Sequence, residues 1–121
     1  NVLIIDTIGI LSNLYRYADI VHIGNGFGKG IHNILEAAVY GKPIIFGPNY
    51  KKFQEAIDLV NLHGAFSFNN INQYLDILSN LYNDKSFYNT ASEVCKNYIK
   101  SNVGATKIIL KYIDDKLKET W

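Results

Sequence analysis

The chain has 121 residues, of which 48% are hydrophobic and 19% charged, a composition typical of one globular domain with a real core. A net charge of +1 gives no bulk electrostatic reason to expect a nucleic-acid or membrane-surface partner. No apolar run approaches the roughly 20 residues of a membrane span, and no signal peptide is visible.

Cysteine and methionine content bear on compartment and origin. The single cysteine, Cys95, cannot form an internal disulfide, which favours the cytosol. Its helical apolar pattern with Ala91, Val94 and Tyr98 predicts a small core residue and not a nucleophile. The chain has no methionine, even at position 1, and begins on an apolar run. We therefore expect a soluble fragment of a longer protein.

Short apolar runs alternate with amphipathic helical patterns in chain order. The runs predict buried strands at 2–5, 20–23, 42–46 and 65–68. The helical patterns lie at 10–18, 31–39, 53–60, 71–82, 87–100 and 103–118. Such alternation produces a parallel sheet covered by helices. The predicted fold class is therefore α/β, a Rossmann-like parallel sheet flanked by helices with a helical C-terminal tail, in a single domain over 1–121.

Three loops that contain glycine follow the first three predicted strands: Asp6–Gly9, Gly24–Gly30 and Gly47–Tyr50. Ligands of open α/β sheets bind beyond the carboxyl ends of the strands. We expect a helix to start near Gly30, so that its free N–H groups and the charge of Lys29 would bind a phosphate. The alternative is that the glycines serve a tight turn only, and the loop alone does not decide between the two.

The polar residues after this loop favour a ligand site. On a helix that starts near Gly30, His32 and Asn33 would lie in the first turn and Glu36 one turn further on the same side. A carboxylate there suits ribose hydroxyls because it accepts two hydrogen bonds. Taken singly, Glu36 is as well explained by a solvated helix face, and His32 or Asn33 by a local cap. Pro48 and Asn49 are typical of a turn and an N-cap.

These residues resemble the donor-binding signature of the transferases of 3-deoxy-D-manno-octulosonic acid (Kdo). The stretches that carry the resemblance are 30–38, 40–43 and 46–50, together with 6–9 and the residues Leu14, Tyr15, Ala18 and Asp19. The resemblance extends from Val2 to about Phe68. It implies a glycosyltransferase of the GT-B type, with two facing Rossmann-like domains, of which this chain is similar to the C-terminal, nucleotide-sugar-binding one.

The family's chemistry implies CMP-Kdo as donor substrate and lipid A or its precursor as acceptor, in lipopolysaccharide biosynthesis at the cytoplasmic face of the bacterial inner membrane. By resemblance, Gly30, His32 and Asn33 hold the phosphate and Glu36 the ribose. The full set of expected donor-binding residues is Gly24, Gly26, Gly28, Lys29, Gly30, His32, Asn33, Glu36, Gly47, Pro48 and Asn49.

No catalytic residue is expected in this chain, because the family's base lies in the N-terminal acceptor domain, which is absent here. We expect the chain alone to be inactive. No cofactor or metal is expected, since His22, His32 and His63 do not share the spacing of a metal site. The sequence departs from the family pattern at Asn25, Ile31 and Ala37, where glycine, glycine and proline are common.

Two other functions and one interface remain open from the sequence. The glycine loop and the carboxylate after it also fit the donor domain of a glycosyltransferase that uses a UDP- or GDP-sugar. A non-enzymatic flavodoxin-like binding domain fits less well, because Asp6 is the only acidic residue at the end of the first predicted strand. An apolar stripe on the last predicted helix, exposed or buried in a dimer, consists of Ile109, Leu110, Ile113 and Leu117, with Tyr112 and Trp121 nearby.

Overall fold

A three-stranded parallel sheet forms the centre of the computed structural model, which describes residues 2, 4, 11–102 and 111–117. The strands are β1 (Val21–Ile23), β2 (Ile44–Phe46) and β3 (Ala65–Ser67), in the order β1-β2-β3. In register, Val21 pairs with Ile44 and Ile44 with Ala65. Three of the predicted strands are therefore confirmed to within two residues at either end.

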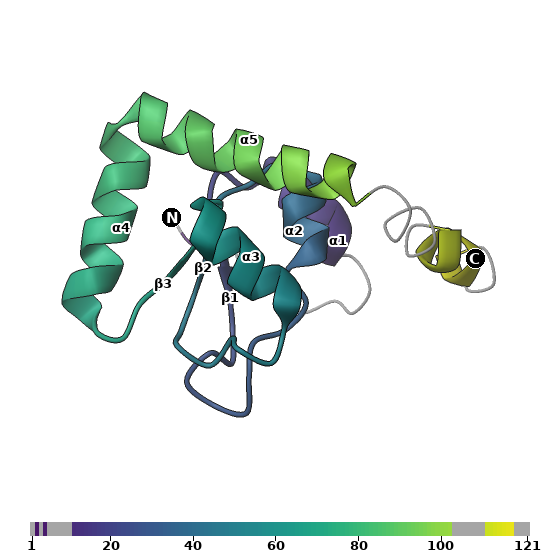
Figure 1. Ribbon diagram of the computed structural model, residues 1–121, viewed down its shortest axis with the longest axis horizontal. Helices are drawn as coiled ribbons and strands as arrows, with labels where there is room; N and C mark the ends of the chain where they lie inside the picture. Colours follow the sequence, from purple (N-terminus) through teal and green to yellow (C-terminus); the bar gives the residue numbers. More distant parts are fainter. Residues whose placement is uncertain (1, 3, 5–10, 103–110, 118–121) are drawn as a thin grey trace.

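Helices connect and follow the strands (Figure 1). They are α1 (Leu11–Leu14), the 3-10 helix η1 (Tyr15–Tyr17), α2 (Leu35–Val39), α3 (Gln54–Leu62), α4 (Ile71–Asn83) and α5 (Lys85–Ser101). Residues 111–117 are also helical. No helix within the described ranges has the length and hydropathy needed to cross a membrane.

At the N-terminal end of the chain one prediction is wrong, and at both ends others fall on residues that the structure does not describe. Val2 and Ile4 are 89% and 84% exposed and belong to no strand, so the prediction of a buried strand is wrong for them. A strand is buried only between a pairing strand and a covering helix, and among the described residues β1 pairs with β2 alone. The loop Asp6–Gly9 lies outside the described residues. So do Ile109, Leu110 and Trp121, and the proposed C-terminal stripe stays a prediction.

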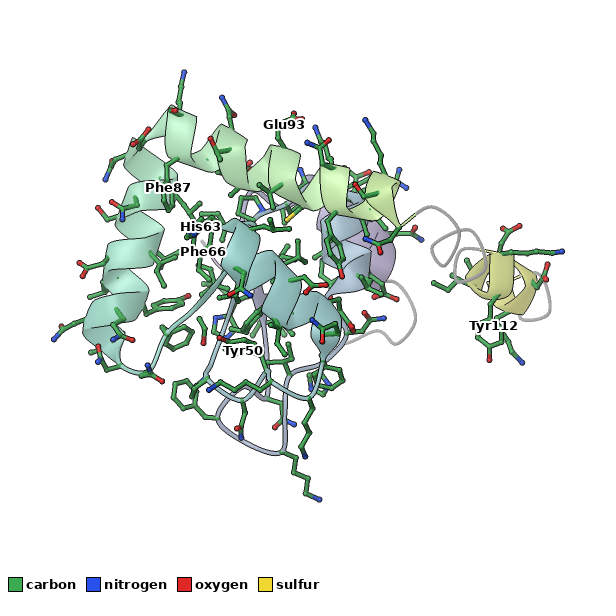
Figure 2. The ribbon with its side chains drawn as sticks, in the orientation of Figure 1. Tyr50, His63, Phe66, Phe87, Glu93 and Tyr112 are labelled. Carbon is green, nitrogen blue, oxygen red and sulfur yellow. The ribbon has the colours of Figure 1, made fainter. Side chains whose placement is uncertain are left out.

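Both faces of the sheet bury apolar side chains. On one face, Ile44 and Phe46 of β2 pack with side chains of α2, α3 and α5. On the other face, Ile45 packs with α4 and with the start of α5, where the rings of Phe66 and Phe87 lie 5.3 Å apart (Figure 2). Figure 1 shows α4 at one side of the sheet, α2 and α3 at the other, and α5 crossing above both.

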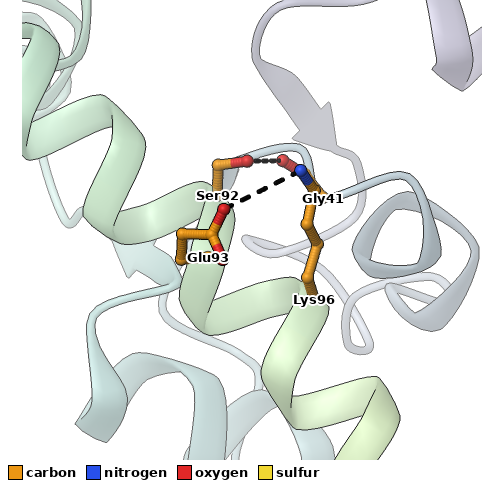
Figure 3. Close-up of polar contacts among 4 residues, drawn as sticks. All are labelled: Gly41, Ser92, Glu93 and Lys96. Carbon is orange, nitrogen blue, oxygen red and sulfur yellow. Dashed lines mark hydrogen bonds and ion pairs between the residues drawn. The ribbon is translucent and has the colours of Figure 1, made fainter.

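Helix α5 is attached through backbone carbonyls to the segments that lead into β2 and β3. The Ser92 hydroxyl donates a 2.6 Å hydrogen bond to the carbonyl of Gly41, which ends α2 with a φ of +67° (Figure 3). The thiol of Cys95 lies 3.3 Å from the carbonyl oxygen of Gly64, and burial raises its pKa to about 12. The prediction that Cys95 is a core residue is confirmed, since its side chain is 0% exposed.

Candidate functional site

The glycine loop after β1 and the loop after β2 lie against each other at the carboxyl edge of the sheet. Gly26 is buried, and a Cβ atom placed on it would be 2.6 Å from the Cα of Gly47. Only glycine permits so close an approach of two backbones. The carbonyl of Gly47 also accepts a 3.0 Å hydrogen bond from the Ser67 hydroxyl at the end of β3. The structure thus brings together the predicted loops 24–30 and 47–50.

Asn49 holds the glycine loop in shape. Its backbone N–H donates to the carbonyl of Gly26 at 2.8 Å, and its side-chain amide donates to the carbonyl of Gly28. Its own carbonyl accepts from the N–H of Ile31 at 3.1 Å. The prediction that Asn49 is an N-cap is wrong, because α3 begins at Gln54 and its N-cap is Phe53. Asn49 instead fixes the conformation of the glycine loop from the neighbouring loop after β2.

Helix α2 begins later than the sequence predicts. It starts at Leu35, so residues 31–34 precede it and the expected helix start near Gly30 is wrong. The physical reason is long-range hydrogen bonding, because the N–H groups of Ile31 and His32 donate to the carbonyls of Asn49 and Gly24. These bonds hold the segment between two loops. His32 and Glu36 therefore do not lie one turn apart on one helical face.

This correction changes which groups can meet an anion. The N–H groups of Ile31 and His32 are occupied by carbonyls, so they are not free donors. The N–H groups of Phe27, Lys29 and Gly30 have no acceptor among the described residues. Their turn is exposed, as is the Lys29 side chain. An anion at this edge would therefore meet the tip of the glycine loop and not a helix dipole, since α2 has only five residues.

His32 and Asn33 both lie beside the loop, with different bonding. The Oδ1 atom of Asn33 accepts a 2.9 Å hydrogen bond from the N–H of Leu35, which is the local cap considered from the sequence. Its amide NH₂ has no acceptor among the described residues and remains a donor. The exposed imidazole of His32 lies over Gly24, where a Cβ atom would be 3.9 Å from its Cδ2 atom.

Glu36 has a neighbour that the sequence analysis did not single out as a site residue. It lies in the first turn of α2 and is half-buried, and its charge acts on the phenol of Tyr15. Burial, and then the charge of Glu36, raise the pKa of Tyr15 above its usual value. No periodicity connects the two positions, because they belong to separate elements. The one sequence signal was that Tyr15 matches the family pattern.

An aromatic hollow of about 310 Å³ lies on the other side of the glycine loop. It was also missed from the sequence. Phe27 of the loop contacts Phe68, whose ring centroid is 4.8 Å from that of Tyr74. His22 of β1 is exposed and contacts the rings of Phe68 and Tyr74. Within the described ranges, no three His, Cys, Asp or Glu side chains group closely enough to hold a metal ion.

Known proteins similar to this chain include Kdo transferases. The chain is 29% identical to the 3-deoxy-D-manno-octulosonic acid transferase of Bordetella pertussis, over 95% of this chain and 27% of that protein. It is 36% identical to the enzyme of the same name from Rickettsia prowazekii, over 66% of this chain and 18% of that protein. A bifunctional glycosyltransferase/methyltransferase of Fusobacterium nucleatum is 26% identical over 100% of this chain and 20% of that protein. No protein-family model matches the chain.

A solved structure decides which part of these proteins the chain is similar to. The C-terminal CMP-Kdo binding domain of WaaA from Acinetobacter baumannii superposes with a TM-score of 0.59 and 28% identity, over 74% of this chain and 50% of that domain. The resemblance to the C-terminal domain of Kdo transferases is confirmed. The predicted fold class is confirmed with it. This Kdo-transferase-like chain spans about a fifth to a quarter of the length of the curated relatives.

Proposed function

We propose that this chain is the donor-binding half of a glycosyltransferase that transfers Kdo from CMP-Kdo to lipid A or its precursor. The observation that carries the proposal is the likeness to the CMP-Kdo binding domain of WaaA, at 28% identity and a TM-score of 0.59. The two loops that hold most of the expected donor-binding residues, 24–33 and 47–49, lie together at the carboxyl edge of the sheet, where α/β domains bind nucleotides.

In this proposal the glycine loop receives the donor phosphate. The unpaired N–H groups of Phe27, Lys29 and Gly30 donate to it, and the ammonium of Lys29 adds a full charge. The amide of Asn33 and the imidazole of His32 supply further donors from the flank. Gly24, Gly26, Gly28, Gly47, Pro48 and Asn49 act indirectly, by fixing the shape of the two loops.

Glu36 receives the ribose in this arrangement. Its carboxylate has no hydrogen-bond partner among the described residues, so both oxygens can accept from sugar hydroxyls. The acceptor and the base belong to a separate domain, since transfer needs both substrates held together and the chain offers a donor side alone. The proposed site of action of the full-length enzyme is the cytoplasmic face of the inner membrane, where its lipid acceptor is made.

The affinity of Glu36 variants for CMP tests this function. Loss of a charge-assisted hydrogen bond costs about 1.5–3 kcal/mol, so Glu36→Ala should weaken CMP binding roughly tenfold or more. Glu36→Gln should weaken it less, because its amide oxygen still accepts one bond. Glu93→Ala is the matched control, as that carboxylate is 65% exposed on α5 and forms one ion pair with Lys96. Tighter binding of UMP or GMP than of CMP would contradict the proposed donor.

A further inference from the structure

Tyr15 is a buried core residue in the segment that precedes β1. It begins the 3-10 helix η1, and its side chain is 8% exposed. It belongs to the same buried cluster as Ile34, Ala37 and Ala38, the residues on both sides of Glu36 in the chain. Both alanines are 0% exposed.

One side-chain contact joins η1 to the end of α2. The guanidinium carbon of Arg16 lies 6.0 Å from the ring centroid of Tyr40, the residue that caps α2. Tyr15 precedes Arg16, and Glu36 stands one turn before Tyr40. Burial, and then the negative charge of Glu36, raise the pKa of Tyr15, which agrees with a position of the phenol near this carboxylate.

The phenol of Tyr15 and the carboxylate of Glu36 are not hydrogen-bonded to each other. No hydrogen bond joins the phenol of Tyr15 to the carboxylate of Glu36, and neither group has a hydrogen-bond partner among the described residues. A phenol can donate one hydrogen bond, whereas a carboxylate can only accept. Together, they offer one donor and several acceptor positions. A vicinal diol presents the complementary set, two hydroxyl donors and the lone pairs of two oxygens.

We propose that Tyr15 contacts the ligand, its hydroxyl donating to one oxygen of the ribose diol whose protons Glu36 accepts. This inference rests on the proposed function, because it places the ribose of CMP beside Glu36. The buried ring would fix the position of the hydroxyl before the nucleotide arrives, so little side-chain entropy is lost on binding. The pair would then select a ribonucleotide over a deoxyribonucleotide.

The competing explanation is that Tyr15 is a core residue only. Tyr15→Phe separates the two, because it keeps the ring that packs against α2 and removes only the hydroxyl. Tyr17→Phe is the matched control, as Tyr17 lies in the same short helix and is 78% exposed. Binding of CMP and of 2′,3′-dideoxy-CMP to each variant distinguishes a lost contact with the diol from a general loss of structure.

Loss of one neutral hydrogen bond should weaken CMP binding by Tyr15→Phe about threefold to tenfold. Binding of dideoxy-CMP should change less than twofold, and Tyr17→Phe should match the parent with both ligands. Equal losses for the two ligands, or no loss for CMP, would overturn the inference. If CMP binding is lost in Glu36→Ala but kept in Tyr15→Phe, the inference fails while the proposed function stands. Absence of CMP binding by the parent chain would overturn both.

A second measurement on the unaltered chain covers the case in which Tyr15→Phe does not fold. The ring carbon that bears the hydroxyl, labelled with ¹³C in all tyrosines, reports on its hydrogen bonding. The Tyr15 signal should shift on addition of CMP and stay in place with dideoxy-CMP. An equal response to both nucleotides, or none to either, would contradict a contact with the diol.

Discussion

Gly26 and Gly47 touch backbone to backbone, and this contact joins the two loops of the candidate site. A methyl group on Gly26 would lie 2.6 Å from the Cα of Gly47, where no flexible side chain can move aside. Two loops that carry no regular secondary structure are thereby held at a fixed separation. The shape of the site depends on this contact as much as on the residues that face a ligand.

Gly26→Ala should therefore destabilise the fold by about 1–3 kcal/mol, the usual cost of overpacking, and should also weaken CMP binding. Gly28→Ala is the control, because a methyl group there meets the side-chain Oδ1 of Asn25 at 2.5 Å, an atom that can rotate away. Chemical denaturation and CMP titration of both variants measure the two effects. Equal stability of the two variants would show that the loops can separate freely.

The hydrogen bond between Tyr98 and Asp58 predicts a loss of stability at alkaline pH. The phenol donates to the carboxylate at 2.9 Å, and burial, this bond and the nearby charges raise the pKa of Tyr98 to about 12. A raised folded-state pKa gives stability that is complete below the unfolded value of 10.0 and is lost as pH rises toward about 12. The free energy of unfolding should therefore decline across this range.

Tyr98→Phe should show a shallower alkaline decline than the parent. Its cost at neutral pH should be about 1 kcal/mol, because Asp58 keeps a 2.8 Å hydrogen bond from Gln54. Denaturation curves of both chains at several pH values measure the difference, in which the titration of all other groups cancels. Parallel pH profiles would refute a folded-state pKa near 12 for Tyr98.

Cys95 should resist thiol reagents while the domain is folded. The thiolate is the reactive form, and burial raises the pKa of this thiol to about 12, so little of it ionises near neutral pH. A colorimetric disulfide reagent should label the native chain slowly and the unfolded chain at once. Rapid stoichiometric labelling of the native chain would mean that α5 opens readily over Gly41 and Gly64.

The sheet could be predicted from the sequence because its strands are short apolar runs that stand out locally. Ile44, Ile45 and Phe46 are all 0% exposed, as expected for a strand buried on both faces. The start of α2 could not be predicted, because Ile31, Ile34 and Leu35 have helical spacing whether or not the backbone is helical. Ile31 and Ile34 are buried, as a helix would also have them. The N–H of Ile31, however, donates to the carbonyl of Asn49 in the loop after β2, and this long-range bond cannot be read from the spacing.

The glycine loop was predicted as a site from its composition, whereas the way in which it is held was not. Asn49 was expected to serve a turn, and its bonds to Gly26, Gly28 and Ile31 depend on how β1 and β2 pair. The pairing of Tyr15 with Glu36 likewise requires η1 to pack against α2. Spacing along one helix can be read from sequence, but contact between separate elements cannot.

Amide chemical shifts during a CMP titration of the ¹⁵N-labelled chain test the central claim most directly. The claim predicts a first group of shifts at Phe27, Lys29, Gly30 and Asn33, beside the phosphate, and a second group at Glu36 and its neighbours in α2, beside the ribose, with α4 unaffected. Unlabelled 2′,3′-dideoxy-CMP should shift the first group and leave the second nearly unchanged. Shifts centred instead on the aromatic hollow around His22, Phe68 and Tyr74, or no shifts at all, would contradict the account.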